Sequence, residues 1–300
     1  MTKTKLGLIV LALVLLVAIS SKLFSGPFKQ ALTFSFSFQS EKLNSIVSKN
    51  TGKIGEYTVY IEELAPEGEI YALRSSDAFP AASLYKVYLL AAVLKKIEDG
   101  PSTSSGLKLE DGVTAEKSHL IEVLGNDEFG IQDLPDQVEF TVDEALTRVG
   151  RISDNFASLM LAEAVGWEKI QSMADSMGAK NTKVYPPPAG GGLIQTSAED
   201  IALFFKKLHR REIVSSAVSE QIIKYLSLNQ INDRIPAGGG KVIHKTGELP
   251  RVRHDAGIVD LGNGRAYIIV LMSKDLQYED EGVETLAKIS KDVYEYFKRK

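Results

Sequence analysis

Apolar and polar residues alternate in short runs near both ends of the chain, a pattern typical of strands with one buried face. The predicted strands are residues 56–64, 69–75, 241–245, 256–261 and 266–273. Ala65-Pro66-Glu67-Gly68 separates the first two and Asn263-Gly264 the last two, so each pair is predicted to form a hairpin.

Between these strands, apolar residues recur every three or four positions, which predicts amphipathic helices. The first runs through Leu84, Val87 and Leu94 and stops at Gly100-Pro101. The other predicted helices of this middle region are residues 142–149, 155–165, 167–177, 198–209 and 219–226. Two more helices, residues 41–49 and 283–299, flank the strands. Ser83 is therefore expected at or near the N-terminus of a helix.

Strands at both ends around a helical middle predict an α+β fold. We expect one antiparallel sheet formed by both chain ends, flanked by helices, with an inserted all-α subdomain. The sheet part comprises residues 41–82 and 241–300, and the helical part comprises residues 83–240. Together they form one expected catalytic domain, residues 41–300.

The N-terminus carries a hydrophobic segment of 16 uncharged residues, Leu6 to Ser21, between Lys5 and Lys22. Its position behind a short cationic start is typical of a membrane anchor or a cleaved signal peptide. Residues 1–24 are assigned to this segment and residues 25–40 to a linker. Either alternative predicts that the chain contacts the membrane and that the rest of it works outside the cytoplasmic membrane.

Charge and composition exclude several other classes of function. The net charge is −4, and the only run of three consecutive Lys or Arg residues is the terminal Lys298-Arg299-Lys300, so no nucleic-acid partner is expected. The absence of cysteine rules out disulfides, thiolate nucleophiles and cysteine-ligated zinc. The four histidines show no metal-ligand spacing, so no metal site is predicted. Nothing in the sequence indicates the oligomeric state.

Three short motifs carry candidate chemistry, and each has residue types suited to serine acyl transfer. They are Ser83-Leu84-Tyr85-Lys86, Ser153-Asp154-Asn155 and Lys245-Thr246-Gly247. Each motif alone has an ordinary structural explanation, a helix cap for the first two and a strand leading into a turn for the third. Their joint occurrence in this order favours one active site.

A second S-x-x-K motif, Ser105-Gly106-Leu107-Lys108, shows why context is needed. It follows a stretch rich in Gly, Pro and Ser, which predicts a loop with solvated side chains. Ser83 instead begins an apolar helix, where positions i and i+3 share one face. Lys86 is therefore expected to reach the Ser83 hydroxyl.

Together the three motifs resemble the class A β-lactamases and penicillin-binding proteins, whose signature they match. The resemblance extends from about Glu41 to the C-terminus and includes Phe79-Pro80-Ala81-Ala82 before Ser83 and Thr196-Ser197-Ala198-Glu199-Asp200. It implies a β-lactamase/transpeptidase-like fold and a small-molecule β-lactam or D-Ala-D-Ala peptide as substrate. The implied chemistry needs no cofactor.

The resemblance also implies a role for each site residue. Ser83 would be the nucleophile, Lys86 its base and Ser153 a proton relay, while the backbone N–H groups of Ser83 and Glu248 would hold the oxyanion. The implied substrate-binding residues are Asn155 for a side-chain amide and Lys245, Thr246 and Arg253 for a carboxylate. A lysine base must be neutral, so we expect burial and the charge of Lys245 to lower the pKa of Lys86.

The chain departs from class A β-lactamases in the second half-reaction, which uses a glutamate in an E-x-x-L-N pattern on the Ω loop. This pattern is missing, and no carboxylate lies between Asp175 and Glu199. Acylation needs none of the missing residues, whereas fast hydrolysis of the acyl-enzyme is in doubt.

Four interpretations therefore stay open. The leading one is a β-lactamase-like serine hydrolase that forms an acyl-enzyme at Ser83 and opens the β-lactam ring. A D,D-peptidase acting on peptidoglycan stem peptides is the second. A β-lactam or muropeptide sensor, acylated without turnover, is the third, and a non-catalytic interaction module is the fourth.

Overall fold

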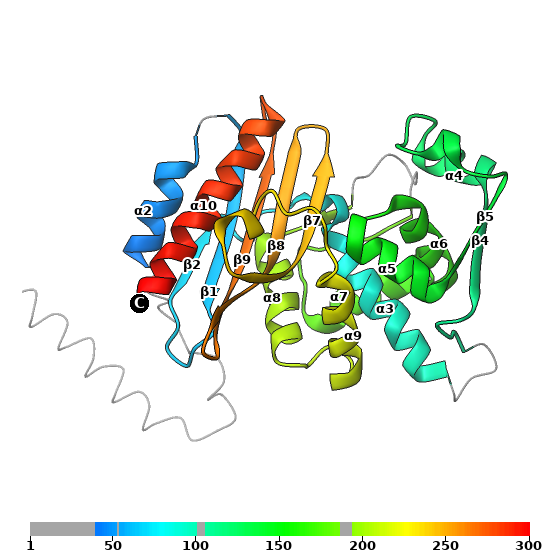
Figure 1. Cartoon of the computed structure of the whole chain (residues 1–300), viewed down its shortest axis with the longest axis horizontal. Helices are drawn as coiled ribbons and strands as arrows, with labels where there is room; N and C mark the ends of the chain where they lie inside the picture. Colours follow the sequence, from blue (N-terminus) through cyan, green and yellow to red (C-terminus); the bar gives the residue numbers. More distant parts are fainter. Residues whose placement is uncertain (1–39, 53, 101–105, 187–193) are drawn as a thin grey trace, which may run out of the picture. The chain divides into compact units, whose positions relative to one another are not determined.

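The computed structural model describes residues 40–52, 54–100, 106–186 and 194–300 (Figure 1). The predicted anchor or signal peptide and all but the last residue of the predicted linker lie outside the described residues. Within the described part of the chain, no helix is both long and apolar enough to cross a membrane.

One five-stranded antiparallel sheet forms the centre of the fold, in the order β2-β1-β9-β8-β7. Its strands are β1 (Glu56–Glu63), β2 (Ile70–Leu73), β7 (Lys241–Leu249), β8 (Val252–Gly262) and β9 (Arg265–Lys274). The β1 strand pairs with β9, so the two ends of the chain meet in one sheet. The predicted α+β fold is confirmed.

Helices cover both faces of the sheet because β9 is apolar on both sides. Ile269 and Leu271 pack with α2 (Glu41–Asn50) and α10 (Glu279–Arg299), which lie side by side in Figure 1. Ile268, Val270 and Met272 point the other way and join the larger core with α8 (Ala198–His209). This larger core places the helical part against the opposite face.

The helical part contains most of the remaining elements. They are η1 (Ala82–Tyr85), α3 (Lys86–Asp99), α4 (Lys117–Leu124), η3 (Ile131–Asp133), α5 (Val142–Ile152), α6 (Asn155–Val165), α7 (Trp167–Met177), α9 (Ser216–Leu226) and η5 (Pro236–Gly238). The bounds of α6, α7 and α8 agree with the sequence prediction.

The helical part is not all-helical, which corrects one detail of the prediction. The strands β4 (Gly112–Glu116) and β5 (Gln137–Thr141) pair in a separate two-stranded sheet, and β3 (Phe79–Pro80) pairs with β6 (Gln195–Thr196). On β4 only Val113 and Ala115 are buried. Two apolar residues give too weak an alternation to predict a strand.

The third motif differs from its predicted setting, because β7 continues through it to Leu249. Thr246 and Gly247 are paired with Asp255 and His254 of β8, so Gly247 lies inside the strand and not in a turn. Since β7 is the outer strand of the sheet, one of its sides faces the helical part. The motif therefore lies where sheet and helices meet.

Candidate active site

The three motifs converge on one cavity of about 310 Å³. Its lining includes Ser83, Ser153, Asn155, Thr246 and Glu248, five of the residues predicted from the sequence. The remaining lining residues are Glu128, Phe129, Ile152, Asp154, Phe156 and Ile231. Residues more than 160 positions apart in the chain thus share one site, as a single acyl-transfer centre requires.

Ser83 lies in η1, the short 3-10 turn that leads into α3. The preceding residue, Ala82, has φ of 47°, a left-handed conformation that is costly for alanine and typical of functional sites. The Ser83 side chain is half-buried, and its hydroxyl makes no hydrogen bond to any residue that the structure describes. The expected hydrogen bond between Lys86 and this hydroxyl is therefore not formed, because Lys86 Nζ is directed to Ser153 and Asn155. The hydroxyl is free to contact a ligand in the cavity.

The β7 strand approaches Ser83 closely at Gly247, where a side chain would be crowded. A Cβ atom there would lie 3.1 Å from the Cβ of Ala82 and 3.3 Å from the backbone nitrogen of Ser83. The backbone of residues 247 and 248 can therefore lie beside that of Ser83. The assignment of the Ser83 and Glu248 N–H groups to the oxyanion stays a prediction.

The second motif forms the junction between α5 and α6. Ser153 ends α5 with φ of 59°, and Asp154 begins α6 by accepting a hydrogen bond from the Ala157 N–H. The Asp154 carboxylate also pairs with Arg148 at 2.6 Å. Cap and ion pair together hold the junction, so Ser153 and Asn155 present their side chains to the cavity.

Two buried lysines meet at Ser153. Lys245 Nζ donates to Ser153 Oγ at 2.7 Å and to the Thr246 carbonyl at 2.8 Å. Lys86 Nζ donates to the Ser153 carbonyl at 2.7 Å, to Asn155 Oδ1 at 2.6 Å and, more weakly, to Ser153 Oγ at 3.5 Å. Ser153 is thus connected to both candidate proton donors, as a relay must be.

Burial gives both lysines the electrostatics of catalytic groups. It lowers the pKa of Lys86 to about 7, against the opposing charges of Asp154 and Glu128. Burial, and then the charge of Lys86, lower the pKa of Lys245 well below its ordinary value. The expected direction for Lys86 holds and burial is its cause, whereas the expected contribution of the Lys245 charge is not among the causes; the effect runs from Lys86 to Lys245.

Arg234 lies beside the candidate site through its contact with Glu248, and no sequence motif marks it. Its side chain is 1% exposed, it pairs with Glu248, and its charge contributes to lowering the pKa of Lys245. Its Nε and Nη1 groups have no hydrogen-bond partner among the described residues, which is costly for a buried guanidinium. Nε lies 3.6 Å from the Asp233 carboxylate, and Arg234 is absent from the residues that line the cavity.

The predicted carboxylate-binding residue Arg253 has other partners. Its guanidinium pairs with Glu279 at the start of α10 and donates to the carbonyls of Leu249 and Val252. Arg253 is absent from the residues that line the cavity. Its predicted role in substrate binding stays a prediction.

Two further observations concern alternatives to this site. In the second S-x-x-K motif, Ser105 lies outside the described residues, and Lys108 is exposed.

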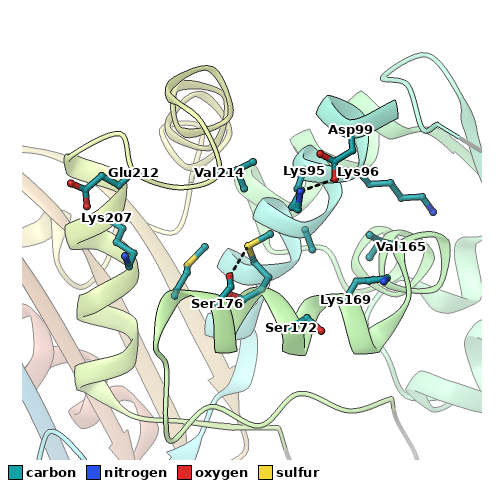
Figure 2. Close-up of a pocket in the computed structure, with 13 residues that line it drawn as sticks. Lys95, Lys96, Asp99, Val165, Lys169, Ser172, Ser176, Lys207, Glu212 and Val214 are labelled. Atoms are coloured by element: carbon teal, nitrogen blue, oxygen red, sulfur yellow. Dashed lines mark hydrogen bonds and ion pairs between the residues drawn. The ribbon is translucent and has the colours of Figure 1, made fainter. Parts of the chain in front are cut away.

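A larger cavity of about 900 Å³ lies elsewhere, lined by residues of α3, α7 and α8 among others (Figure 2). None of the described residues that line it belongs to the three motifs. The smaller cavity is therefore the candidate active site.

Comparison with known proteins agrees with this site. The sequence profile described as the β-lactamase enzyme family matches residues 39–297. No curated protein matches the chain.

Solved structures similar to the chain include PBP-A, with 25% sequence identity and a TM-score of 0.76 over 87% of this chain and 97% of that one. A point mutant of PBP-A in an acyl-enzyme complex with penicillin G is 24% identical, with a TM-score of 0.73 over 86% and 97%. A β-lactamase from Sphaerobacter thermophilus is 20% identical, with a TM-score of 0.72 over 85% and 96%, and shows the same fold. Since the family profile covers most of the chain, the protein belongs to the β-lactamase enzyme family.

Proposed function

We propose that this protein is a serine hydrolase that forms an acyl-enzyme at Ser83 with β-lactams or with D-Ala-D-Ala peptides. One observation carries the proposal: a buried lysine whose pKa is about 7 lies three residues after a serine that faces the cavity. A lysine is a general base only when neutral, and this environment supplies the neutral form near pH 7.

In the proposed acylation step, Lys86 accepts the Ser83 proton while Ser83 Oγ bonds to the carbonyl carbon. The backbone N–H groups of Ser83 and Glu248 hold the oxyanion. When the carbon–nitrogen bond breaks, Ser153 donates its hydroxyl proton to the leaving nitrogen and receives another from Lys245 or Lys86. The hydrogen bonds that connect Ser153 to both lysines support this relay.

The substrate carboxylate is proposed to bind at Lys245 and Thr246. Its negative charge would favour the protonated form of Lys245 while Lys86 stays neutral. Both arginines pair with a carboxylate, Arg234 with Glu248 and Arg253 with Glu279. Of the two, Arg234 has buried N–H groups without a hydrogen-bond partner among the described residues, and its charge acts on Lys245. We therefore assign the third carboxylate contact to Arg234, in preference to the predicted Arg253.

Arg234→Gln is expected to slow acylation by about 10- to 100-fold, because a charged hydrogen bond contributes about 1.5–3 kcal/mol. Arg253→Gln, the matched control, should change the rate less than threefold. The second-order acylation rate with a chromogenic cephalosporin measures both, with thermal unfolding as a check on folding. The reverse ranking would restore Arg253 as the carboxylate-binding residue.

Release of the acyl group is the step that separates the alternatives. With no carboxylate between Asp175 and Glu199, we propose slow hydrolysis of the β-lactam acyl-enzyme. A D,D-peptidase is the second candidate, favoured by the same missing glutamate and by the similarity to PBP-A. A sensor acylated without turnover would share only the acylation step with the β-lactamase and the D,D-peptidase.

The time course of intact protein mass distinguishes these functions. We expect a β-lactam adduct that persists for many turnover times of an efficient β-lactamase, together with release of D-Ala from a D-Ala-D-Ala peptide. Rapid return to the free mass would identify a β-lactamase with another water-activating group. A permanent adduct without peptide turnover would identify a sensor, and no adduct would refute the proposed function.

We further propose that the protein acts outside the cytoplasmic membrane, attached to it or directed across it by residues 6–21. The support is the uncharged N-terminal segment, and the substrates proposed above are found in that compartment. Separation of membrane and soluble fractions from cells that express the full chain tests this placement.

A further inference from the structure

One carboxylate in the active-site cavity has no role in the mechanism above. Glu128 lies in the loop between α4 and η3, half-buried, and lines the same cavity as Ser83. Gly125 and Gly130, with φ of 96° and 80°, permit the backbone reversals that bring this loop to the cavity. Glu128 is 27 positions before Asn155 and belongs to none of the three motifs.

Glu128 contacts Asn155, the residue that is assigned to bind the substrate's side-chain amide. Asn155 Nδ2 donates to Glu128 Oε1 at 2.9 Å, and Asn155 Oδ1 accepts from Lys86 at 2.6 Å. The Asn155 amide group has two N–H donors, so one remains for a substrate carbonyl. A substrate side chain bound at Asn155 would therefore pass next to the Glu128 carboxylate.

Among the described carboxylates that line the cavity, Glu128 is the one without an ion pair, although its charge also acts on Lys86, which is neutral in the proposed acylation step. Three carboxylates line the cavity, and Asp154 pairs with Arg148 while Glu248 pairs with Arg234. Among the described residues, Glu128 has no lysine or arginine within 4.0 Å and is hydrogen-bonded to the neutral Asn155. A partly buried carboxylate without a cationic partner favours binding of a cation.

Two exposed apolar residues line the same cavity as Glu128. Phe129 is 95% exposed and Ile152 is 46% exposed, and both line the cavity with Glu128. Exposed apolar groups around one charged group suit a ligand with an aliphatic chain that ends in a charge. The charge complementary to Glu128 is an ammonium group.

We propose that Glu128, Phe129 and Ile152 form an ammonium subsite that selects substrates whose acyl side carries an aliphatic chain ending in a free primary amine. In a stem peptide this chain belongs to an unblocked diamino acid residue before D-Ala-D-Ala. The inference rests on the proposed function, because the subsite acts on the substrate that acylates Ser83.

The test compares two peptides that differ only in the side-chain amine, Nα-acetyl-L-Lys-D-Ala-D-Ala and Nα,Nε-diacetyl-L-Lys-D-Ala-D-Ala. We expect kcat/KM of the full chain to be about fivefold higher for the free amine, as for a partly solvated ion pair. Glu128→Gln keeps an acceptor for Asn155 and should bring the ratio close to one. The exposed neighbour in the same loop gives the matched control, Asp127→Asn, which should keep the preference.

A second pair of substrates separates this inference from the choice between peptidase and β-lactamase. Penicillins with a 6-aminohexanoyl or a 6-acetamidohexanoyl side chain should show the same preference in acylation rate, measured by intact mass. Equal rates for both members of each pair, or an unchanged preference in Glu128→Gln, would overturn the subsite while leaving acylation at Ser83 intact. Equal losses for both members in Glu128→Gln would make Glu128 a positioning residue for Asn155. Absence of acylation by all four compounds would refute the proposed function, and the subsite with it.

Discussion

Ser83→Ala is expected to abolish adduct formation with a chromogenic cephalosporin, a loss of roughly 10⁴-fold or more in acylation. The change removes the nucleophilic oxygen and leaves the rest of the cavity in place. Because the hydroxyl makes no hydrogen bond to the described residues, the thermal stability should stay within about 0.5 kcal/mol of the parent. Intact mass after incubation gives the result directly.

Ser105→Ala is the control, because Ser105 begins the second S-x-x-K motif of the chain. It should form the adduct at the parent rate. Its lysine, Lys108, is exposed, so nothing in its surroundings favours the neutral amine that a base requires. Equal loss of the adduct in both variants would refute the assignment of the nucleophile.

The second large effect concerns Lys86, and it appears as a pH dependence. The burial that lowers the pKa of Lys86 to about 7 makes the neutral amine the minor form below pH 7 and the major form above it. The acylation rate should therefore rise about tenfold per pH unit below 7 and level off above it, and it should fall at higher pH when Lys245, whose pKa is also lowered, loses its proton. Stopped-flow measurements of acylation between pH 5 and pH 9 test this profile.

Lys86→Met removes the base and keeps an apolar chain of similar length in the buried position. Acylation should fall by about 10²- to 10⁴-fold, the usual contribution of a general base, and the rise near pH 7 should disappear. Asn155 and Ser153 lose a hydrogen-bond donor, so the unfolding temperature is measured in parallel. A parent enzyme whose rate is independent of pH, or a variant that keeps the rise, would assign the base to another group.

Most of the fold follows from local patterns. The helices α6, α7 and α8 begin and end where the apolar periodicity and capping residues predict. The hairpin of β8 and β9 turns at Asn263-Gly264, and Asn263 has the positive φ that this turn needs. The pair β4 and β5 was missed because a five-residue strand with two buried residues carries little periodic signal.

The features of the site also divide into those that the local sequence predicts and those that depend on the tertiary structure. The sequence alone determined the candidate nucleophile, its candidate lysine and the other two motifs, because acyl transfer needs particular residue types and local spacing is enough to place Lys86 one turn after Ser83. Only the tertiary structure decided that Arg234 has buried N–H groups without a hydrogen-bond partner among the described residues, that Glu128 meets Asn155, and that burial lowers the pKa of Lys86. These properties depend on desolvation and on pairing between charges far apart in the chain, which no local pattern encodes.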